Sequence, residues 1–306
     1  MKTISLKWVL MILLSVFVLS CKKDSETPVA SSGSGTGSGS GSDGGSGSGG
    51  GSTSSATARY TQNATLEDYT GLNCGYCPGA HTYLQKAGTA YGAKVIPMEI
   101  HGTAYESPGS PFIYAPADNL ASTFSVDGFP SIRLNRTIDL GYGGDPTPDI
   151  KSYVTAATSS AISSTVGLAI NSSLSGAVLS ITVKSRFSNA TSGSKLVVYV
   201  LENGVAGNQS SYFNNNSSSP YYQQGGTLTY LHDGVLRISA SALLGDAIQT
   251  QAAAAEYSKT YTVAVPAGWN SSNLSIAAMV VTSANKLINA QQAKVGQVQD
   301  FQILAP

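Results

Sequence analysis

The sequence has little charge and no motif for several common kinds of site. Only 11% of its 306 residues are charged, and 17 basic residues balance 17 acidic ones. Binding to nucleic acid needs a concentrated basic patch, so this composition argues against a nucleic-acid partner. The sequence also contains no phosphate-binding loop, nucleophile elbow or paired-carboxylate site, and no internal repeat is evident. We therefore assign no cofactor from the sequence.

Long hydrophobic runs are also few, and the clearest one begins the chain. Two lysines precede an apolar run over residues 8–19, which ends at Ser20 and Cys21. This run is short for a membrane span and is typical of a secretory signal peptide. The segment VLSC (residues 18–21) resembles a bacterial lipobox, although its first two residues depart from the usual pattern. We predict a lipoprotein signal peptide over 1–20 and lipidation of Cys21; an ordinary signal peptide is the alternative.

The residues after Cys21 indicate a tethered protein of the cell envelope. CKKD followed by a polar tail resembles lipoproteins of Bacteroidetes-like bacteria, which implies a lipid anchor in the outer membrane. Residues 31–57 are almost wholly Gly, Ser and Thr, so they cannot bury enough apolar surface to fold. About 30 such residues have a root-mean-square reach of roughly 30 Å. Residues 21–57 are therefore predicted to be a flexible tether.

Composition and periodicity change after residue 57. Three predicted strands, within ATLEDYTG, AKVIPMEIH and GFPSIRLNR, alternate with predicted helices over 78–91, over ADNLASTFSV and over TPDIKSYVTAATSSAI. This alternation predicts an α/β domain over residues 58–163. From residue 164 to 306 the pattern changes to period two, as in AVLSITVKS, KLVVYVLE, TLTYLHDGVLRIS, KTYTVAVP and LSIAAMVVTS. Such strands predict an antiparallel β-sandwich domain.

Cysteine is scarce, at three residues in the chain. If Cys21 is lipidated, Cys74 and Cys77 remain as a Cys-x-x-Cys pair in an oxidising compartment. The pair lies between a predicted strand and a predicted helix. A helix N-terminus lowers the pKa of a nearby thiol, and a second thiol one turn later can resolve a mixed disulfide. We predict thiol–disulfide exchange with Cys74 as nucleophile and Cys77 as resolving thiol.

Two further segments fit the exchange hypothesis. Asp68 ends the strand before the pair, at an offset where thioredoxin-like proteins place a buried carboxylate that takes a proton from the second cysteine; a plain strand-end Asp is the alternative. The segment VDGFPS resembles the place where such folds have a cis-proline facing the disulfide. Pro130 is then predicted to be cis, with Phe129 and Pro130 docking an extended substrate. An ordinary trans proline is the alternative.

The same cysteines have two other possible roles. A zinc site could use Cys74, Cys77, His81 and His101, but the chain has only three histidines and His81 is expected to face solvent. We therefore assign no metal ligands. Haem attachment is excluded because Pro78, not His, follows Cys77. A permanent structural disulfide remains open.

The other polar residues near these segments carry weaker signals. Glu99 and His101 close the second predicted strand, where they could tune the thiols but are expected to be solvated. His232 and Asp233 are adjacent in YLHDGVLR, a predicted hairpin region, where turn formation is favoured over metal binding or acid–base chemistry.

The order of these segments resembles the Omp28-related outer-membrane lipoproteins of Bacteroidetes over roughly residues 60–300. The resemblance depends on LEDYTGLNCGYCPGAH, NLASTFSVDGFPS…NR and YLHDGVLR, followed by a strand-rich tail. It implies a thioredoxin-like domain followed by a β-sandwich, anchored in the outer membrane. CGYC is also similar to the active site of periplasmic disulfide isomerases, but no segment matches their dimerisation domain.

Two functions remain open from the sequence. The first is thiol–disulfide exchange with thiols or disulfides of envelope or secreted proteins. The second is a non-catalytic surface lipoprotein, in which the cysteines form a structural disulfide and the β-sandwich binds an unknown ligand. A fold of this kind serves both enzymes and binding modules, so the resemblance alone does not choose between them. The sequence also leaves open whether the folded part faces the periplasm or the medium.

Overall fold

A computed structural model describes residues 58–141 and 162–305 of the chain. The described residues form one compact unit. The predicted signal peptide, Cys21, the tether and nearly all of the helix predicted from residue 147 onward lie outside the described residues. No helix among the described residues is long and apolar enough to cross a membrane.

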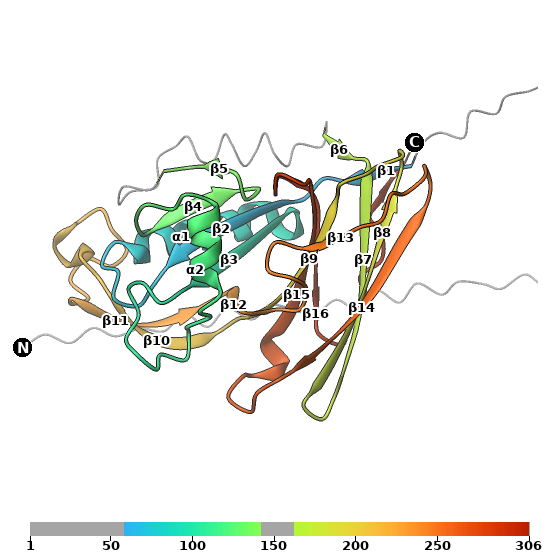
Figure 1. The fold of residues 1–306 in the computed structure, drawn as a ribbon. Coiled ribbons are helices and arrows are strands. Elements are labelled where there is room, and N and C mark those ends of the chain that lie inside the picture. The colour runs from blue at the N-terminus through green and yellow to red at the C-terminus, as the bar shows by residue number, and fades with distance from the viewer. Residues whose placement is uncertain (1–57, 142–161, 306) are drawn as a thin grey trace, which may run out of the picture. The chain divides into compact units, whose positions relative to one another are not determined.

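A nine-stranded mixed sheet organises the unit (Figure 1). Its strands are, in spatial order, β16 (Leu287–Lys294), β15 (Leu274–Val281), β9 (Lys195–Glu202), β12 (Val235–Ser239), β3 (Val95–His101), β2 (Ala64–Thr70), β4 (Ser131–Leu134) and β5 (Ile138–Asp139), with β13 (Asp246–Ala247) also paired to β9. The β2–β3 and β3–β12 pairs are parallel and the others are antiparallel. Because β12 pairs with β3, the sheet contains strands from before and after residue 163, the predicted boundary between the two domains.

Two helices cover opposite faces of the early strands. Helix α1 (Cys77–Tyr91) has Pro78 in its first turn, where a proline costs no helical hydrogen bond, and ends at Gly92, whose φ is 54°. It is followed by the short 3₁₀ helix η1 (Gly92–Lys94). The apolar face of α1 packs over β2 and β4, whereas α2 (Ala117–Thr123) packs over the other face through Leu120.

The strongly apolar strands β9 and β15 are buried on both faces, because successive side chains of a strand point in opposite directions. One set of side chains joins the α2 core, and the alternate set packs against a three-stranded sheet. That sheet contains β7 (Val166–Ser175), β8 (Val178–Phe187) and β14 (Glu256–Ala264). The fold is therefore β-rich, with two packed sheets at one end and helices at the other.

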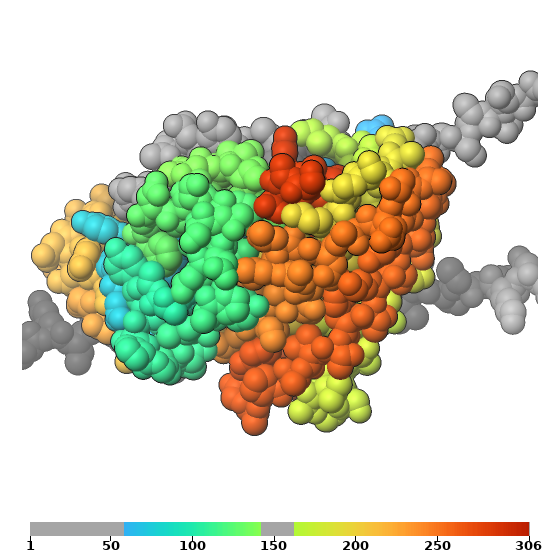
Figure 2. Space-filling model, in the orientation of Figure 1, coloured from blue at the N-terminus to red at the C-terminus, as the bar shows by residue number. Residues whose placement is uncertain are grey.

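The remaining elements are short. A hairpin of β10 (Val205–Ser210) and β11 (Thr227–His232) has η2 (Phe213–Asn215) in its connection, and η3 (Ser271–Asn273) precedes β15. A small sheet joins β1 (Arg59–Thr61), β6 (Ser163–Ser164) and β17 (Ile303–Leu304). In Figure 2, residues before and after position 163 lie side by side on the visible face, as the shared sheet requires.

Most predicted elements of the first part are confirmed. The helix expected over 78–91 is α1, and the strands expected before and after it are β2 and β3. A turn predicted within YLHDGVLR is present between β11 and β12, at Gly234, whose φ is 72°. The two strands do not form a hairpin with each other, because β11 pairs with β10 and β12 pairs with β9 and β3.

Candidate functional site

Cys74 and Cys77 form a disulfide at the start of α1. Strand β2 ends at Thr70, and a six-residue loop then leads to Cys77, the first residue of the helix. The loop is folded tightly, since the backbone N–H of Cys77 donates to the carbonyl oxygen of Cys74 at 3.2 Å. Both sulfur atoms therefore lie at the N-terminal end of a 15-residue helix, where exposed N–H groups stabilise a thiolate.

A segment far along the chain lies over this loop. The side-chain amide of Gln209, at the end of β10, donates to the carbonyl oxygen of Cys74 at 2.9 Å. The backbone N–H of Ser210 donates to Leu72, and that of Tyr212 donates to Gly75, each at 2.8 Å. We refer to residues 209–212 as the cover segment.

The cover segment and the loop fit closely at Gly75. A Cβ atom at this position would lie 2.5–2.6 Å from the ring of Tyr212, so only glycine allows this approach. Tyr212 also contacts Tyr76 edge to face, with 5.0 Å between ring centroids. Cys74 is 3% exposed and Cys77 is fully buried. In this conformation an outside thiol therefore cannot reach Cys74 freely.

Asp68 is wholly buried in β2, and neither carboxyl oxygen has a hydrogen-bond partner among the described residues. The imidazole of His81 lies close to it, with Nε2 at 3.8 Å from Asp68 Oδ2. Burial, and then the negative charge of Glu99, raise the pKa of Asp68 well above its ordinary value. A carboxyl group of this kind can hold or accept a proton near neutral pH.

The Phe129–Pro130 peptide bond is cis, as the sequence predicted. The two residues directly precede β4. The ring of Phe129 lies 5.4 Å from that of Tyr105, and the carbonyl oxygen of Tyr105 accepts a hydrogen bond from Asn73. Tyr105 thus connects the proline loop to the cysteine loop.

The expectations for several polar residues were wrong. His81 is fully buried rather than solvent-facing, and Glu99 and His101 are buried rather than solvated. His232 is also fully buried, and its Nδ1 donates to Glu99 Oε2 at 2.7 Å. Asp233 lies between β11 and β12, and its Oδ1 accepts a hydrogen bond from the backbone N–H of Gly204, which lies between β9 and β10. All three histidines of the chain are therefore gathered in one buried cluster, which the sequence did not predict.

The cluster is connected to the cysteine loop through Glu106. His101 Nδ1 lies 2.8 Å from Glu106 Oε1, which also accepts a hydrogen bond from the backbone N–H of Leu72 at 3.0 Å. Burial alone would lower the pKa of His101, but its contacts with Glu106 and Glu99 outweigh this and raise it. These contacts tie β3 to the loop that holds the disulfide.

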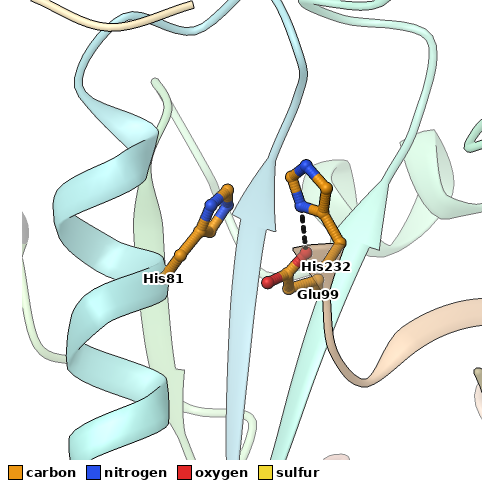
Figure 3. Close-up of side chains that lie close together, drawn as sticks. All are labelled: His81, Glu99 and His232. Carbon is orange, nitrogen blue, oxygen red and sulfur yellow. Dashed lines mark hydrogen bonds and ion pairs between the residues drawn. The ribbon is translucent and has the colours of Figure 1, made fainter. Parts of the chain in front are cut away.

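The buried cluster offers metal ligands, whereas the combination of Cys74, Cys77, His81 and His101 considered from the sequence does not. Cys74 and Cys77 are bonded to each other, so this oxidised form offers no thiolate ligand. His81, Glu99 and His232 instead present one ligand atom each, all within 4.8 Å of one another (Figure 3). Their nitrogen and oxygen atoms are typical ligands of divalent transition metals.

Comparison with known proteins identifies the family. The family described as outer membrane protein Omp28 matches residues 117–299, which is more than half of the chain. The chain belongs to the Omp28 family. No curated protein sequence matches it.

Solved structures include a similar fold. HBP35 of Porphyromonas gingivalis superposes with a TM-score of 0.62 at 20% identity, covering 81% of this chain and 80% of HBP35. A domain of the outer membrane lipoprotein Omp28 from the same organism matches 44% of this chain and 89% of its own length, with 19% identity and a TM-score of 0.28. The likeness to HBP35 concerns the fold alone.

Proposed function

We propose that this Omp28-family protein is an outer-membrane-anchored lipoprotein whose Cys74–Cys77 disulfide exchanges with protein thiols and disulfides of the envelope. The observation that carries the proposal is the disulfide at the N-terminus of α1, in the loop that follows strand β2. Around it, β3 is parallel to β2, while β4 and β5 follow antiparallel, and a cis-proline precedes β4. This arrangement supports a thioredoxin-like assignment for the early part of the chain.

The exchange step uses both thiols of the reduced protein. The Cys74 thiolate attacks one sulfur of a substrate disulfide, which forms a mixed disulfide and releases one substrate thiolate. Cys77 then loses its proton and attacks the Cys74 sulfur, which releases the second substrate thiolate. Two electrons pass to the substrate, and the Cys74–Cys77 bond of the present structure is formed. The same steps run in reverse when a substrate dithiol meets the disulfide.

Asp68 is the proposed acceptor of the Cys77 proton. Its raised pKa makes Asp68 a stronger base than an ordinary carboxylate. The difference in pKa between Asp68 and the Cys77 thiol is correspondingly smaller, which favours proton transfer. Phe129 and Pro130 are the proposed docking residues for an extended substrate. Their support is the connection through Tyr105 to the cysteine loop.

The reduction potential of the cysteine pair tests the proposal. It can be measured on the full chain by alkylation and mass spectrometry across a glutathione or dithiothreitol series. A potential of roughly −120 to −270 mV is the range of thiol oxidoreductases, whereas a value below about −300 mV marks a structural disulfide. In cells, Cys77→Ser should trap mixed disulfides through Cys74. The Cys74→Ser/Cys77→Ser variant is the matched control and should trap none.

One observation favours a second candidate function. Cys74 is 3% exposed beneath the cover segment, which suits a permanent structural disulfide. In that case the protein is a surface lipoprotein whose strand-rich part binds a partner. A potential below about −300 mV, together with no trapped species in Cys77→Ser, would establish this alternative over exchange.

The membrane anchor is a separate part of the proposal. The lipobox-like segment before Cys21 supports lipidation of that cysteine. The intact chain should fractionate with the outer membrane and carry acyl chains by mass spectrometry, whereas Cys21→Ser should lose both properties. Protease digestion of intact cells would then determine which side of the membrane the folded part faces.

A further inference from the structure

We propose that His81, Glu99 and His232 bind one divalent transition-metal ion, reached through the cavity beside α1. The three side chains come from α1, β3 and the end of β11, and converge as drawn in Figure 3. Their exposed fractions are 0%, 3% and 0%. One ligand atom from each lies within 4.8 Å of those of the other two. This site is separate from the disulfide, and the proposal does not depend on thiol exchange.

The spacing is close to that of a zinc site. Zinc lies about 2.0–2.2 Å from nitrogen and oxygen ligands, so two ligands of a tetrahedral ion are roughly 3.4 Å apart. Separations of up to 4.8 Å in the cluster must therefore shorten by as much as roughly 1.4 Å on binding. We expect rotation of the three side chains to supply this change.

Two nitrogen atoms in the cluster have unused bonding capacity. His81 Nδ1 and His232 Nε2 are buried and have no hydrogen-bond partner among the described residues. The other nitrogen of each ring is held, His81 Nε2 by Thr70 Oγ1 at 2.9 Å and His232 Nδ1 by Glu99. Buried polar atoms without partners are costly, so the hydrogen bonds among the described residues do not saturate the cluster.

The donor set also suits a cation, because two imidazoles and one carboxylate are typical ligands of divalent transition metals. Imidazole binds a metal in its neutral form and a carboxylate in its ionised form.

The surrounding contacts hold the ligands in place. His101 Nε2 lies 3.5 Å from Glu99 Oε2, and Glu106 holds the other nitrogen of His101. The backbone N–H of Glu99 donates to Gly234, which fixes β3 against the turn that follows His232. Partners of this kind orient metal ligands and tune their affinity.

A cavity of about 500 Å³ gives access to the cluster. Its lining includes His81 and Glu99, together with Asn203 and Asp233. Three protein ligands leave a fourth position of a tetrahedral ion open, as in catalytic zinc sites. Since the cavity meets two of the ligands, that open position would face a space that admits water or a small ligand.

Metal binding by the full oxidised chain is the test. Titration with Zn²⁺ against a chromogenic chelator should give one ion per chain. Glu99→Gln and His232→Asn should each weaken binding by at least about 100-fold, because loss of a direct ligand should exceed the 10- to 100-fold effect of outer-shell changes. Glu202→Gln, which removes another buried carboxylate that pairs with Arg237, should bind as the native chain does.

X-ray absorption spectroscopy of the zinc-loaded native chain identifies the ligand atoms directly. It needs no variant, so it tests the proposal even if Glu99→Gln or His232→Asn does not fold. It should show nitrogen and oxygen ligands, the scattering of two imidazoles, and no sulfur at about 2.3 Å. The Cys74→Ser/Cys77→Ser variant should bind with unchanged affinity. The proposal is overturned if the native chain binds no stoichiometric zinc, if Glu99→Gln binds as the native chain does, or if sulfur ligates the ion.

Discussion

Gly75 is the residue at which the cysteine loop and the cover segment approach most closely. A methyl group there would overlap the Tyr212 ring, at 2.5–2.6 Å from three of its atoms. We expect Gly75→Ala to lower the free energy of unfolding by about 1–3 kcal/mol, the usual cost of overpacking. Urea denaturation measures this change.

Two further variants test whether Gly75→Ala is destabilising because its methyl group overlaps Tyr212, rather than because any glycine-to-alanine change is. Gly268→Ala places its methyl group in open space and should change stability little. Adding Tyr212→Ala to Gly75→Ala should restore most of the lost stability, since the overlap is removed. A double variant as unstable as the sum of its single changes would contradict this account.

The buried histidines illustrate what single residues in a sequence do not reveal. A histidine one turn into a short helix is usually exposed, whereas His81 is buried because it contacts Thr70 of β2 and the rings of Tyr230 and His232 in β11. His232 meets Glu99 through the pairing of β12 with β3, a contact between distant parts of the chain. One available signal was that Glu99 and His101 end the strand beside the cysteine pair. The cis bond at Pro130 was predictable because VDGFPS, by its position after the cysteine pair, resembles the cis-proline segment of thioredoxin-like folds.

At the scale of elements, the cover segment is expected to control access to the disulfide. Gln209→Ala removes the buried side-chain amide that donates to Cys74 and Gly71. Loss of hydrogen bonds worth about 1.4 kcal/mol makes opening roughly tenfold more frequent. Reduction by dithiothreitol should therefore be about tenfold faster, as followed by timed alkylation.

A glutamine elsewhere provides the control for this prediction. Gln85→Ala changes an exposed position on α1 and should leave the reduction rate unchanged. If Gln209→Ala is reduced at the native rate while folded, the cover segment does not limit access to Cys74.

A second element-scale contact joins β13 to β14. Asp246 Oδ2 accepts hydrogen bonds from Lys259 Nζ at 3.0 Å and from Tyr261 Oη at 2.9 Å. Burial alone would raise the pKa of Asp246, but these bonds outweigh it and lower the pKa. An acid with a depressed folded-state pKa adds stability above its unfolded pKa, and this stability is lost as pH falls through the folded value.

Asp246→Asn should therefore cost about 1 kcal/mol of unfolding free energy at pH 7, and less as pH falls below about 4. Urea denaturation of both proteins at several pH values measures the difference. Combining Asp246→Asn with Lys259→Met should cost less than the sum of the single changes, because both remove one ion pair. A cost independent of pH would show that the ionised carboxylate does not stabilise this contact.

Elements of the early part were predictable because their signals are local. Pro78 marks the start of α1 and Gly92 its end, and the short strands β2 and β3 precede and follow the helix in the sequence. The position of β12 could not be predicted in this way. The turn within YLHDGVLR was predicted from local residues, but no local pattern shows that β11 pairs with β10 while β12 pairs with β9 and β3.

At the scale of the whole molecule, the shared sheet makes the two predicted parts interdependent. Strands β3 and β12 pair across residue 163. Arg136 is fully buried, forms an ion pair with Glu67 at 3.3 Å, and donates to the Tyr199 hydroxyl at 3.0 Å. Residues of β9, β15 and α2 lie in one apolar core. A single cooperative unit is expected from such contacts.

Equilibrium unfolding can measure this cooperativity with two probes. Trp269, the single tryptophan outside the predicted signal peptide, packs against the core beside β14, while amide exchange follows β2 and β3. Both probes should give the same urea midpoint. Arg136→Ala leaves Glu67 buried without its partner and should cost about 3–5 kcal/mol, which lowers both midpoints together. If the variant loses protection in β2 and β3 while Trp269 keeps its native midpoint, the shared sheet does not couple the two parts.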